Sequence, residues 1–357
     1  MKIAVVFGTR PEIIKLSPIV RALNKKGQDF FVIHTNQHYD KNMDEIFLEE
    51  LELPKAKYNL NIGSGTHANM TGRMLIEVEK ILLSEKPDLL IVQGDTNTVL
   101  SVSLAASKLH IKVAHIEAGL RSYTKIPEET NRVLTDRISD FCFTPTELQK
   151  EILTGEGIDS ENIFVVGNTI VDAVIENLKI AENKVKTLEK FDLEPNKYFL
   201  VTAHREENVD NQTKAEDILK AISDIQKKHD VKIIFPTHPR TKKQFENFEL
   251  KLPENIIFTP PLGYLDMLIL MKNAKLILTD SGGIQEEACI LETPCLTMRE
   301  ATERPESIKV GGNTIVGTDY DKIIEEAEKM LNKKITWYNP FGDGTSAEKI
   351  VDILVQN

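Results

Sequence analysis

The chain has 357 residues, of which 41% are hydrophobic and 28% are charged. These proportions are typical of a globular protein and exclude a disordered chain, and the length predicts about two domains. The net charge of −11 argues against a surface that binds nucleic acid or an anionic membrane, because such a surface needs a basic face. The three cysteines include no C-x-x-C pair, so we expect buried thiols in a reducing, cytoplasmic compartment, without disulfides or a zinc site. The first apolar run, residues 3–7, is too short for a signal-peptide core or a membrane span.

Short β-branched runs alternate with helical periodicity along the chain. The first series of predicted strands is 3–7, 30–34, 89–93, 113–116, 141–143 and 163–166, and the second is 198–202, 232–236, 255–259, 275–278, 295–298 and 314–316. The first helical stripe is expected to end at Gly27 and to be interrupted at Pro18. Continuous apolar strands separated by amphipathic helices indicate parallel sheets that are covered on both faces.

A Lys- and Glu-rich helical stretch at 171–191 separates the two series. We therefore expect an N-terminal domain at 1–168, a second domain at 169–340, and a terminal helix at 341–357 that returns to the first domain. That helix would begin with a capping box from Thr345 to Glu348 and bury one stripe of side chains: Ala347, Ile350, Val351 and Leu354. The pattern predicts an α/β fold, with two doubly wound Rossmann-like domains facing a central cleft.

The stretch 278–288 reads as a strand that turns directly into a helix. Ser281, Gly282 and Gly283 leave backbone N–H groups unhindered at the start of that helix, where an anion such as a diphosphate is favoured. Glu287, one turn further on, could accept hydrogen bonds from a ribose diol. The alternative is a steric turn that needs glycine only for its φ angle or for close packing.

Polar clusters follow most of the predicted strands, at the edge where doubly wound sheets bind ligands. Any one cluster has a simpler explanation: Asp95 could cap a helix, a lone histidine could be satisfied in its loop, and Arg10 and Lys15 could be solvated cations. Capping does not explain all of them together on one edge of each sheet. The clusters are 8–12, 36–38, 94–96, 117–121, 203–206, 237–239 and 299–306.

These clusters resemble the motifs of the non-hydrolysing UDP-N-acetylglucosamine 2-epimerases, which have the two-domain GT-B fold. The similarity runs from the first strand to near the last helix, in the motifs at 7–12, 93–96, 115–121, 127–132, 202–208, 280–283 and 302–306. The chain departs from the pattern at Ile126, where many relatives carry an aromatic residue, and at Met267, where some have Phe against the uracil.

The resemblance implies reversible C2 epimerisation of UDP-N-acetylglucosamine to UDP-N-acetylmannosamine, a precursor for surface polysaccharide or glycan synthesis. The C2 hydrogen is not next to a carbonyl, so the family's route eliminates UDP to a glycal and adds it back after reprotonation on the other face. The implied catalytic residues are Asp95, Glu117, Glu128 and His204. The implied substrate-binding residues are Arg10, Lys15, Leu262, Met267, Ser281, Gly282, Gly283, Glu287 and Arg304.

No cofactor or metal is implied, because the first strand lacks G-x-G-x-x-G and no H-E-x-x-H is present. Crowded carboxylates should raise the pKa of at least one of them. The alternatives are a retaining UDP-sugar glycosyltransferase of the same fold and a UDP-sugar-binding regulator without turnover.

The resemblance also implies a homodimer. Because residues of both domains would hold one nucleotide, we expect ligand binding to close the cleft about a hinge near Gly167-Asn168 and near 339–343. In several bacterial relatives a second substrate molecule binds beside the active site. The residues implied for such an allosteric site are Gln37, His38, Met43, Arg73, Arg205 and His238.

Overall fold

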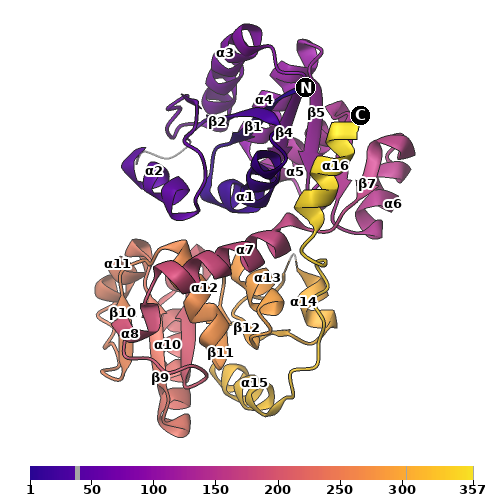
Figure 1. Ribbon diagram of the computed structural model, residues 1–357. Coiled ribbons are helices and arrows are strands. Elements are labelled where there is room, and N and C mark those ends of the chain that lie inside the picture. Colours follow the sequence, from indigo (N-terminus) through magenta and orange to yellow (C-terminus); the bar gives the residue numbers. More distant parts are fainter. Residues whose placement is uncertain (37–40, 303, 357) are drawn as a thin grey trace. The chain divides into compact units, whose positions relative to one another are not determined.

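The computed structural model describes residues 1–36, 41–302 and 304–356, in two compact units (Figure 1). Unit 1 comprises residues 1–176 and 342–357, and unit 2 comprises residues 177–341. No helix in the described part of the chain is long and apolar enough to cross a bilayer.

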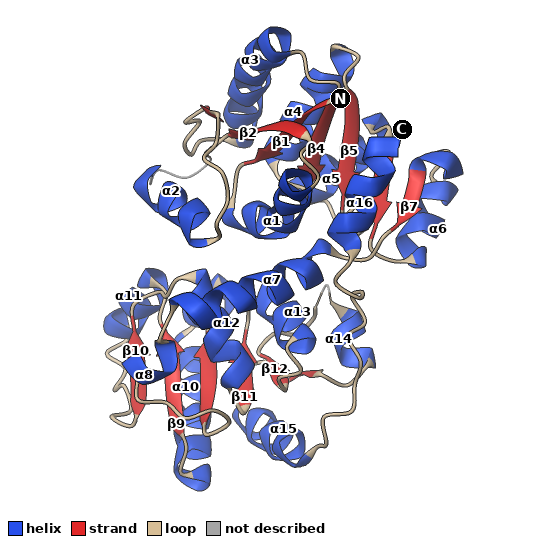
Figure 2. Cartoon of the chain, viewed as in Figure 1, coloured by secondary structure: helices blue, strands red, loops and turns tan. Residues whose placement is uncertain are grey.

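A sheet of seven parallel strands forms the centre of unit 1, in the order β3-β2-β1-β4-β5-β6-β7. The strands are β1 (Lys2–Phe7), β2 (Asp29–His34), β3 (Tyr58–Asn59), β4 (Leu89–Gln93), β5 (Lys112–Ile116), β6 (Phe141–Thr144) and β7 (Ile163–Val165). Helices cover both faces of the sheet (Figure 2). They are α1 (Arg10–Lys25), α2 (Lys41–Glu50), α3 (His67–Glu85), α4 (Asn97–Lys108), α5 (Pro127–Ile138), α6 (Glu147–Gly155), the short η1 (Ser160–Asn162), the first part of α7 (Thr169–Lys184), and α16 (Ser346–Gln356). Val99 and Val102 of α4 share a fully buried apolar cluster with Val92 of β4.

Unit 2 contains six parallel strands in the order β10-β9-β8-β11-β12-β13. The strands are β8 (Tyr198–Thr202), β9 (Lys232–Pro236), β10 (Ile256–Thr259), β11 (Leu276–Thr279), β12 (Cys295–Thr297) and β13 (Asn313–Ile315). Its helices are α8 (Thr187–Lys190), α9 (Glu206–Val209), α10 (Gln212–His229), α11 (Pro239–Asn247), α12 (Tyr264–Asn273), α13 (Gly282–Ile290), α14 (Pro305–Lys309) and α15 (Tyr320–Asn332). Ile222 of α10 and Ile323 of α15 pack in one buried cluster with Phe199 of β8.

Both sheets reverse their strand order at the same place, between the first and fourth strands of the unit. The prediction of two doubly wound parallel sheets is therefore confirmed. The predicted strands are present with ends shifted by a residue or two, whereas the edge strand β3 was not predicted because two residues carry no periodic pattern. The three cysteines are free and buried, as expected.

Helix α1 runs unbroken from Arg10 to Lys25, so the interruption expected at Pro18 is wrong. Proline lacks the N–H that would bond to the carbonyl oxygen of Ile14. The Ser17 hydroxyl donates to that oxygen at 2.8 Å and replaces the missing hydrogen bond. Gly27 has a φ of 64°, in the left-handed region that glycine favours, so its predicted place at the end of α1 is confirmed.

The helical stretch expected at 171–191 is divided into α7 and α8. Helix α8 begins at Thr187, whose buried hydroxyl donates to Asp266 of α12 at 2.5 Å. This contact fixes α8 within unit 2.

The capping box predicted for α16 is wrong. The Thr345 hydroxyl donates to Asp343 at 2.5 Å, and Glu348 pairs with Lys25 of α1 at 3.0 Å. A carboxylate 175 positions earlier in the chain serves as the cap: Asp172 of α7 accepts the Ala347 N–H at 2.9 Å.

Helix α16 lies beside α1 in unit 1 (Figure 1). The stripe predicted to be buried is confirmed, and it consists of Ala347, Ile350, Val351 and Leu354. The helix therefore completes the unit in which the chain begins.

Candidate active site

Glu117 is held by donors from three parts of unit 1. Its Oε1 lies 2.6 Å from Lys15 Nζ and accepts from Asn168 Nδ2 at 3.0 Å, and its Oε2 accepts from Gln93 Nε2. The residue is 6% exposed. A buried carboxylate with a lysine and two amide donors is stabilised in its ionised form. The structure thus brings together the predicted residues Lys15 and Glu117.

The backbone at Glu117 is itself unusual. Its φ is 67°, a left-handed conformation that non-glycine residues seldom adopt. Gly119 follows at 82°, and a Cβ there would lie 2.7 Å from the Gln149 carbonyl oxygen. The chain therefore turns sharply after β5, and this turn places Glu117 at the end of the strand. Strained residues of this kind cluster at functional sites.

Asp95 lies in the neighbouring loop, directly after β4. Its Oδ2 is 2.6 Å from Arg132 Nη2 and 2.9 Å from Arg132 Nε. The loop is tied to α5 again by Asn131 Nδ2, which donates to the Asp95 carbonyl oxygen at 2.9 Å. The side chain of Asp95 is 29% exposed, so solvent or a ligand reaches it.

Glu12 is a carboxyl that sequence reasoning missed as a site residue. It is 3% exposed and lies next to the loop that carries Asp95, where its Oε1 accepts from the Thr96 hydroxyl. Burial raises the pKa of Glu12 to about 7, although hydrogen bonds from Thr96, Gly8 and Thr9 act to lower it. The signal in the sequence was T-x-x-E at 9–12, the pattern of a helix capping box.

Two predicted residues of unit 1 lie at exposed positions. Arg10 is the first residue of α1, with its guanidinium 5.6 Å from the centre of the Phe47 ring. Glu128 is in the first turn of α5 and is also exposed. Its neighbour Glu129 instead pairs with Arg132 at 2.9 Å and accepts from Ser122.

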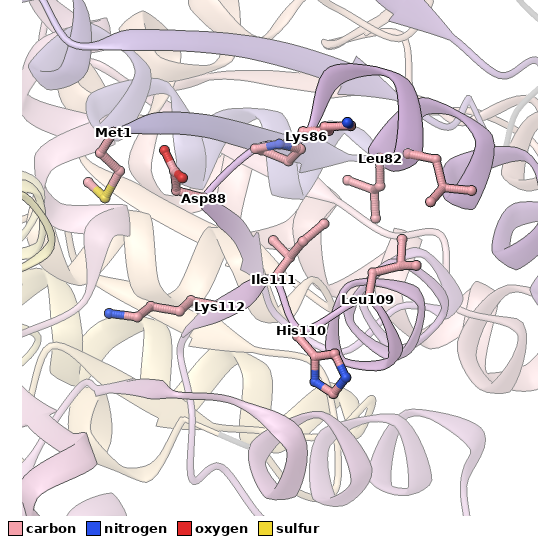
Figure 3. A pocket seen from close by; sticks show the side chains of 10 residues that line it. Met1, Leu82, Lys86, Asp88, Leu109, His110, Ile111 and Lys112 are labelled. Atoms are coloured by element: carbon pink, nitrogen blue, oxygen red, sulfur yellow. The ribbon is translucent and has the colours of Figure 1, made fainter.

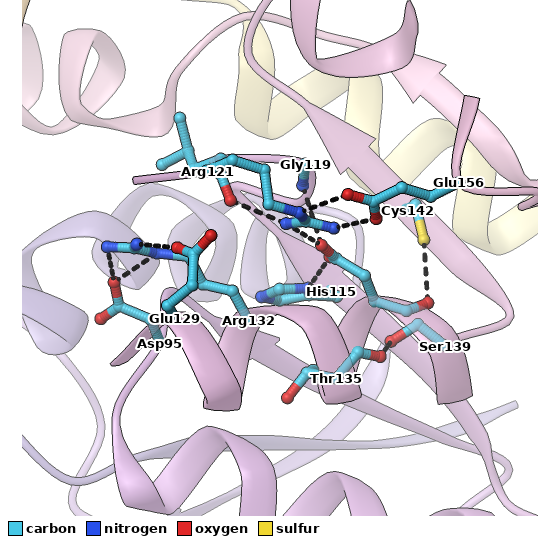
Figure 4. A network of polar contacts seen from close by, with 12 residues as sticks. Asp95, His115, Gly119, Arg121, Glu129, Arg132, Thr135, Ser139, Cys142 and Glu156 are labelled. Carbon is cyan, nitrogen blue, oxygen red and sulfur yellow. Dashed lines mark hydrogen bonds and ion pairs between the residues drawn. The ribbon is translucent and has the colours of Figure 1, made fainter. Parts of the chain in front are cut away.

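Figure 4 shows polar contacts around Asp95, His115 and Arg121. His115 contacts Asp136 Oδ1 through Nδ1 at 2.7 Å and the Gly94 carbonyl oxygen through Nε2 at 2.8 Å. Asp136 also accepts from Arg121 at 2.7 Å. Burial alone would lower the pKa of His115, but the charge and hydrogen bond of Asp136 outweigh burial and raise it. Two acceptors on one imidazole favour the doubly protonated ring, which ties β5 to the Gly94–Asp95 loop.

In unit 2, His204 and Asp280 form a pair at the carboxyl ends of β8 and β11. His204 Nδ1 lies 2.9 Å from Asp280 Oδ1, and Asp280 Oδ2 accepts the N–H groups of His204 and Arg205 at 2.9 Å each. Burial would raise the pKa of Asp280, but the His204 contact and these N–H groups lower it. Asp280 is fully buried whereas the His204 side chain is 46% exposed, so the pair presents the imidazole to solvent.

The N-terminus of α13 has room for an anion. Ser281 is the N-cap residue and makes no side-chain hydrogen bond to the helix. Neither Gly282 nor Gly283 has a positive φ, and a Cβ built at Gly283 meets no described protein atom within 4 Å. Neither a special φ nor close packing within the described residues therefore accounts for glycine at position 283.

The remaining predicted residues of unit 2 are buried or partly buried. Arg304 Nε lies 2.7 Å from Glu286 Oε1, and Glu287 is buried on α13 at 7% exposure. Leu262 and Met267 are half-buried, just before and within α12.

The residues predicted for an allosteric site are described only in part. Gln37, His38 and the side chain of Met43 lie outside the described residues. Arg73 donates to the Ile62 carbonyl oxygen at 2.8 Å, and Arg205 donates to that of Asp280 at 3.0 Å. The His238 ring accepts the Arg240 N–H at 3.2 Å as the cap of α11.

A pocket of about 580 Å³ lies at the opposite edge of the unit 1 sheet (Figure 3). Its lining includes Met1, Asp88 and Lys112, at or just before the starts of β1, β4 and β5. Ligands of doubly wound sheets bind at the carboxyl ends of strands, so this pocket is not the candidate site.

The chain is similar to known proteins over nearly its full length. The family model described as UDP-N-acetylglucosamine 2-epimerase matches residues 21–355. The UDP-N-acetylglucosamine 2-epimerase of Methanocaldococcus jannaschii is 58% identical over 99% of both chains. A crystal structure of the enzyme from that organism, in complex with UDP-GlcNAc and UDP, has a TM-score of 0.87 at 58% identity and full coverage of both chains. The UDP-2,3-diacetamido-2,3-dideoxy-D-glucuronate 2-epimerase of Pseudomonas aeruginosa is 40% identical over all of both chains.

Proposed function

Because the chain belongs to the UDP-N-acetylglucosamine 2-epimerase family and is an isomerase acting on UDP-N-acetylglucosamine, we propose that it works by elimination of UDP and readdition. The identity of 58% over 99% of both chains is the observation that carries the activity. The mechanism rests on the residues at the carboxyl edges of the two sheets.

The chemistry requires a good leaving group and two proton-transfer groups. Loss of UDP makes C1 of the sugar electron-poor and acidifies the C2 hydrogen, so the glycal forms as the C2 proton leaves. Reprotonation of C2 on the opposite face and return of UDP to C1 give UDP-N-acetylmannosamine. Atoms and electrons balance without a redox cofactor.

We assign proton transfer to unit 1, where Asp95, Glu117 and Glu128 supply the acid and the base. The Lys15 contact at 2.6 Å keeps Glu117 ionised, as a base requires. We assign Lys15 to the acid–base pair and Arg10 to the nucleotide.

We assign the leaving group to unit 2. The Ser281 N–H donates to Thr279 Oγ1 at 3.0 Å, so the N–H groups of Gly282 and Gly283 would hold the diphosphate. They would be helped by the Ser281 hydroxyl, by Arg304 and by the Nε2 of His204. Glu287 would accept from the ribose, and Leu262 and Met267 would contact the uracil. His204 suits this role because Asp280 lies 2.9 Å from its Nδ1, which leaves Nε2 to face the ligand.

The test is incubation of the protein with UDP-N-acetylglucosamine alone in heavy water. We expect deuterium at C2 and formation of UDP-N-acetylmannosamine. The D95N, E117Q and E128Q variants should each lose about a hundredfold in turnover, with much smaller changes in KM. Unlabelled substrate would favour the glycosyltransferase of the same fold. Exchange only with UDP-2,3-diacetamido-2,3-dideoxy-D-glucuronate would move the specificity to that of the Pseudomonas relative.

We also propose regulation by the substrate through a second site that includes Arg73, Arg205 and His238. A second ligand that favours the active conformation would contribute about 1–3 kcal/mol of coupling. The reverse reaction from UDP-N-acetylmannosamine should then be slow until a little UDP-N-acetylglucosamine is added. An immediate full rate would contradict this regulation.

The three buried free thiols support a reducing, cytoplasmic location.

A further inference from the structure

Glu12 is a buried carboxyl at the candidate active site to which the reaction above assigns no role. It belongs to α1, but its carboxylate bridges two loops at the carboxyl edge of the sheet. Oε2 accepts the N–H groups of Gly8 at 2.5 Å and Thr9 at 2.9 Å, in the loop after β1. Oε1 accepts from the Thr96 hydroxyl, in the loop after β4 that carries Asp95.

Thr96 shows that this bridge is more than helix capping. It is the N-cap residue of α4, yet its side chain makes no hydrogen bond to that helix. Its hydroxyl is directed to Glu12 instead. An N-cap threonine that bonds to its own helix stabilises it by about 1 kcal/mol. The Thr96 contact to Glu12 takes the place of that interaction.

The protonation state of Glu12 decides which partner donates in this hydrogen bond. Oε2 faces two backbone N–H groups, which can only donate, so a proton on Glu12 must reside on Oε1. That proton would point at Thr96 Oγ1, and the hydroxyl would then have to accept. Protonation of Glu12 therefore reverses the hydrogen bond and turns the hydroxyl hydrogen of Thr96 away.

The reversal of the Glu12–Thr96 hydrogen bond would take place next to the residues assigned to proton transfer. On the neighbouring loop, the charge of Asp95 raises the pKa of Glu12, in addition to the larger effect of burial. Asp95 pairs with Arg132 of α5, and Lys15 of α1 pairs with Glu117.

We propose that Glu12 is a positioning residue of the epimerase. Its ionisation sets the direction of the Glu12–Thr96 hydrogen bond and thereby how the 94–96 loop holds Asp95 in position. This inference rests on the proposed function, because it takes Asp95 as a proton-transfer group. It assigns to Glu12 a role that is exerted through Thr96 and the 94–96 loop, without contact between Glu12 and the sugar.

The experiment measures kcat and KM against pH, by C2 deuterium exchange, for wild type and for E12Q, T96V and T96S. The wild-type kcat should change between two plateaus with a midpoint near the raised pKa of Glu12, about 7. The E12Q variant should show no such change and remain at the acidic plateau, because its amide donates to Thr96 as the protonated acid does. Its KM should stay within about twofold of wild type.

The threonine variants act as matched controls. T96V removes the donor that favours ionised Glu12, so its midpoint should move to higher pH, whereas T96S keeps the hydroxyl and should restore the wild-type midpoint. Infrared spectroscopy gives a readout independent of activity. A protonated-carboxyl band should titrate with the same midpoint in wild type and be missing in E12Q.

Two results would overturn the proposal in an active wild-type enzyme: an E12Q profile that keeps the wild-type midpoint, or an infrared band unchanged by E12Q. Failure of the proposed function has a different signature, since wild type itself would then incorporate no deuterium at C2.

Discussion

Gly283 lies at the second position of α13, in open space among the described residues. Alanine at this position should raise helix stability by about 1 kcal/mol, because glycine is a poor helix former. Its methyl group would also narrow the approach to the helix N-terminus. We therefore expect G283A to raise the melting temperature but to weaken UDP binding about tenfold, or 1.4 kcal/mol.

The matched control is G155A at the end of α6, where a Cβ also meets no described atom within 4 Å. It should leave UDP affinity unchanged in calorimetric titration. Equal UDP affinity of G283A and wild type would contradict binding of the diphosphate at the N-terminus of α13.

Asp280 is expected to fix the orientation of the His204 ring and the nitrogen that carries its proton. In D280N the amide oxygen must face the N–H groups of His204 and Arg205, so the amide nitrogen faces His204 Nδ1. A donor at that position requires Nδ1 to accept, so the ring would adopt the other tautomer or turn away. Turnover should fall by about tenfold or more, since a histidine in the wrong tautomer or orientation no longer presents the required nitrogen to the substrate.

A control for this variant is E206Q, which alters an exposed carboxylate paired with Arg240. It should keep wild-type turnover. Wild-type turnover in D280N would show that Asp280 only accepts the backbone N–H groups of His204 and Arg205 and has no effect on the His204 ring.

The edges of the two sheets were predictable from sequence, but the partners of the site residues were not. Apolar runs ending in polar clusters place Asp95, Glu117 and His204, because parallel strands end at one edge. The pairs Thr96–Glu12, His115–Asp136 and His204–Asp280 join residues 84, 21 and 76 positions apart. No periodic pattern links residues so distant. The left-handed backbone at Glu117 is likewise imposed by the turn after β5, against the usual preference of glutamate.

At the scale of elements, Asp172 is the cap that joins α16 to α7. Removal of the carboxylate in D172A leaves the Ala347 N–H without its partner, and this should cost about 1 kcal/mol of unfolding free energy. Asparagine is also a good cap residue, so D172N should lose less. Chemical denaturation measures both, and limited proteolysis should cut D172A first near residues 342–346. Equal stability of D172A and wild type would contradict the capping role.

The contact between β5 and the Gly94–Asp95 loop should depend on pH through His115. Burial lowers the pKa of His115, Asp136 raises it, and the net shift is upward. A raised folded-state pKa contributes stability that is complete below the unfolded value of about 6.5 and is lost as pH rises through the folded value. The difference in unfolding free energy between wild type and H115Q should therefore shrink as the pH increases above about 6.5. A difference that grows or stays constant with pH would contradict the charged imidazole.

For the whole molecule we expect a homodimer in solution. Ile76 and Leu83 are 57% and 55% exposed, seven residues apart on one face of α3. Apolar side chains in this arrangement suit a self-complementary contact. The double variant I76S/L83S should shift the mass in light scattering from dimer to monomer. The control L148S alters an equally exposed leucine on α6 and should leave the mass unchanged. A monomeric wild type would refute the prediction.

Unit 1 is discontinuous in sequence, with residues 342–357 separated from residues 1–176 by the whole of unit 2. During synthesis the buried stripe of α16 therefore reaches α1 only after the complete second sheet has left the ribosome. At about 5–20 residues per second, this delay is roughly ten to thirty seconds. Unit 2 can fold in that interval, while the surface of α1 that α16 covers is left exposed. Premature termination within unit 2 would thus leave a nascent chain prone to aggregation through its N-terminal half.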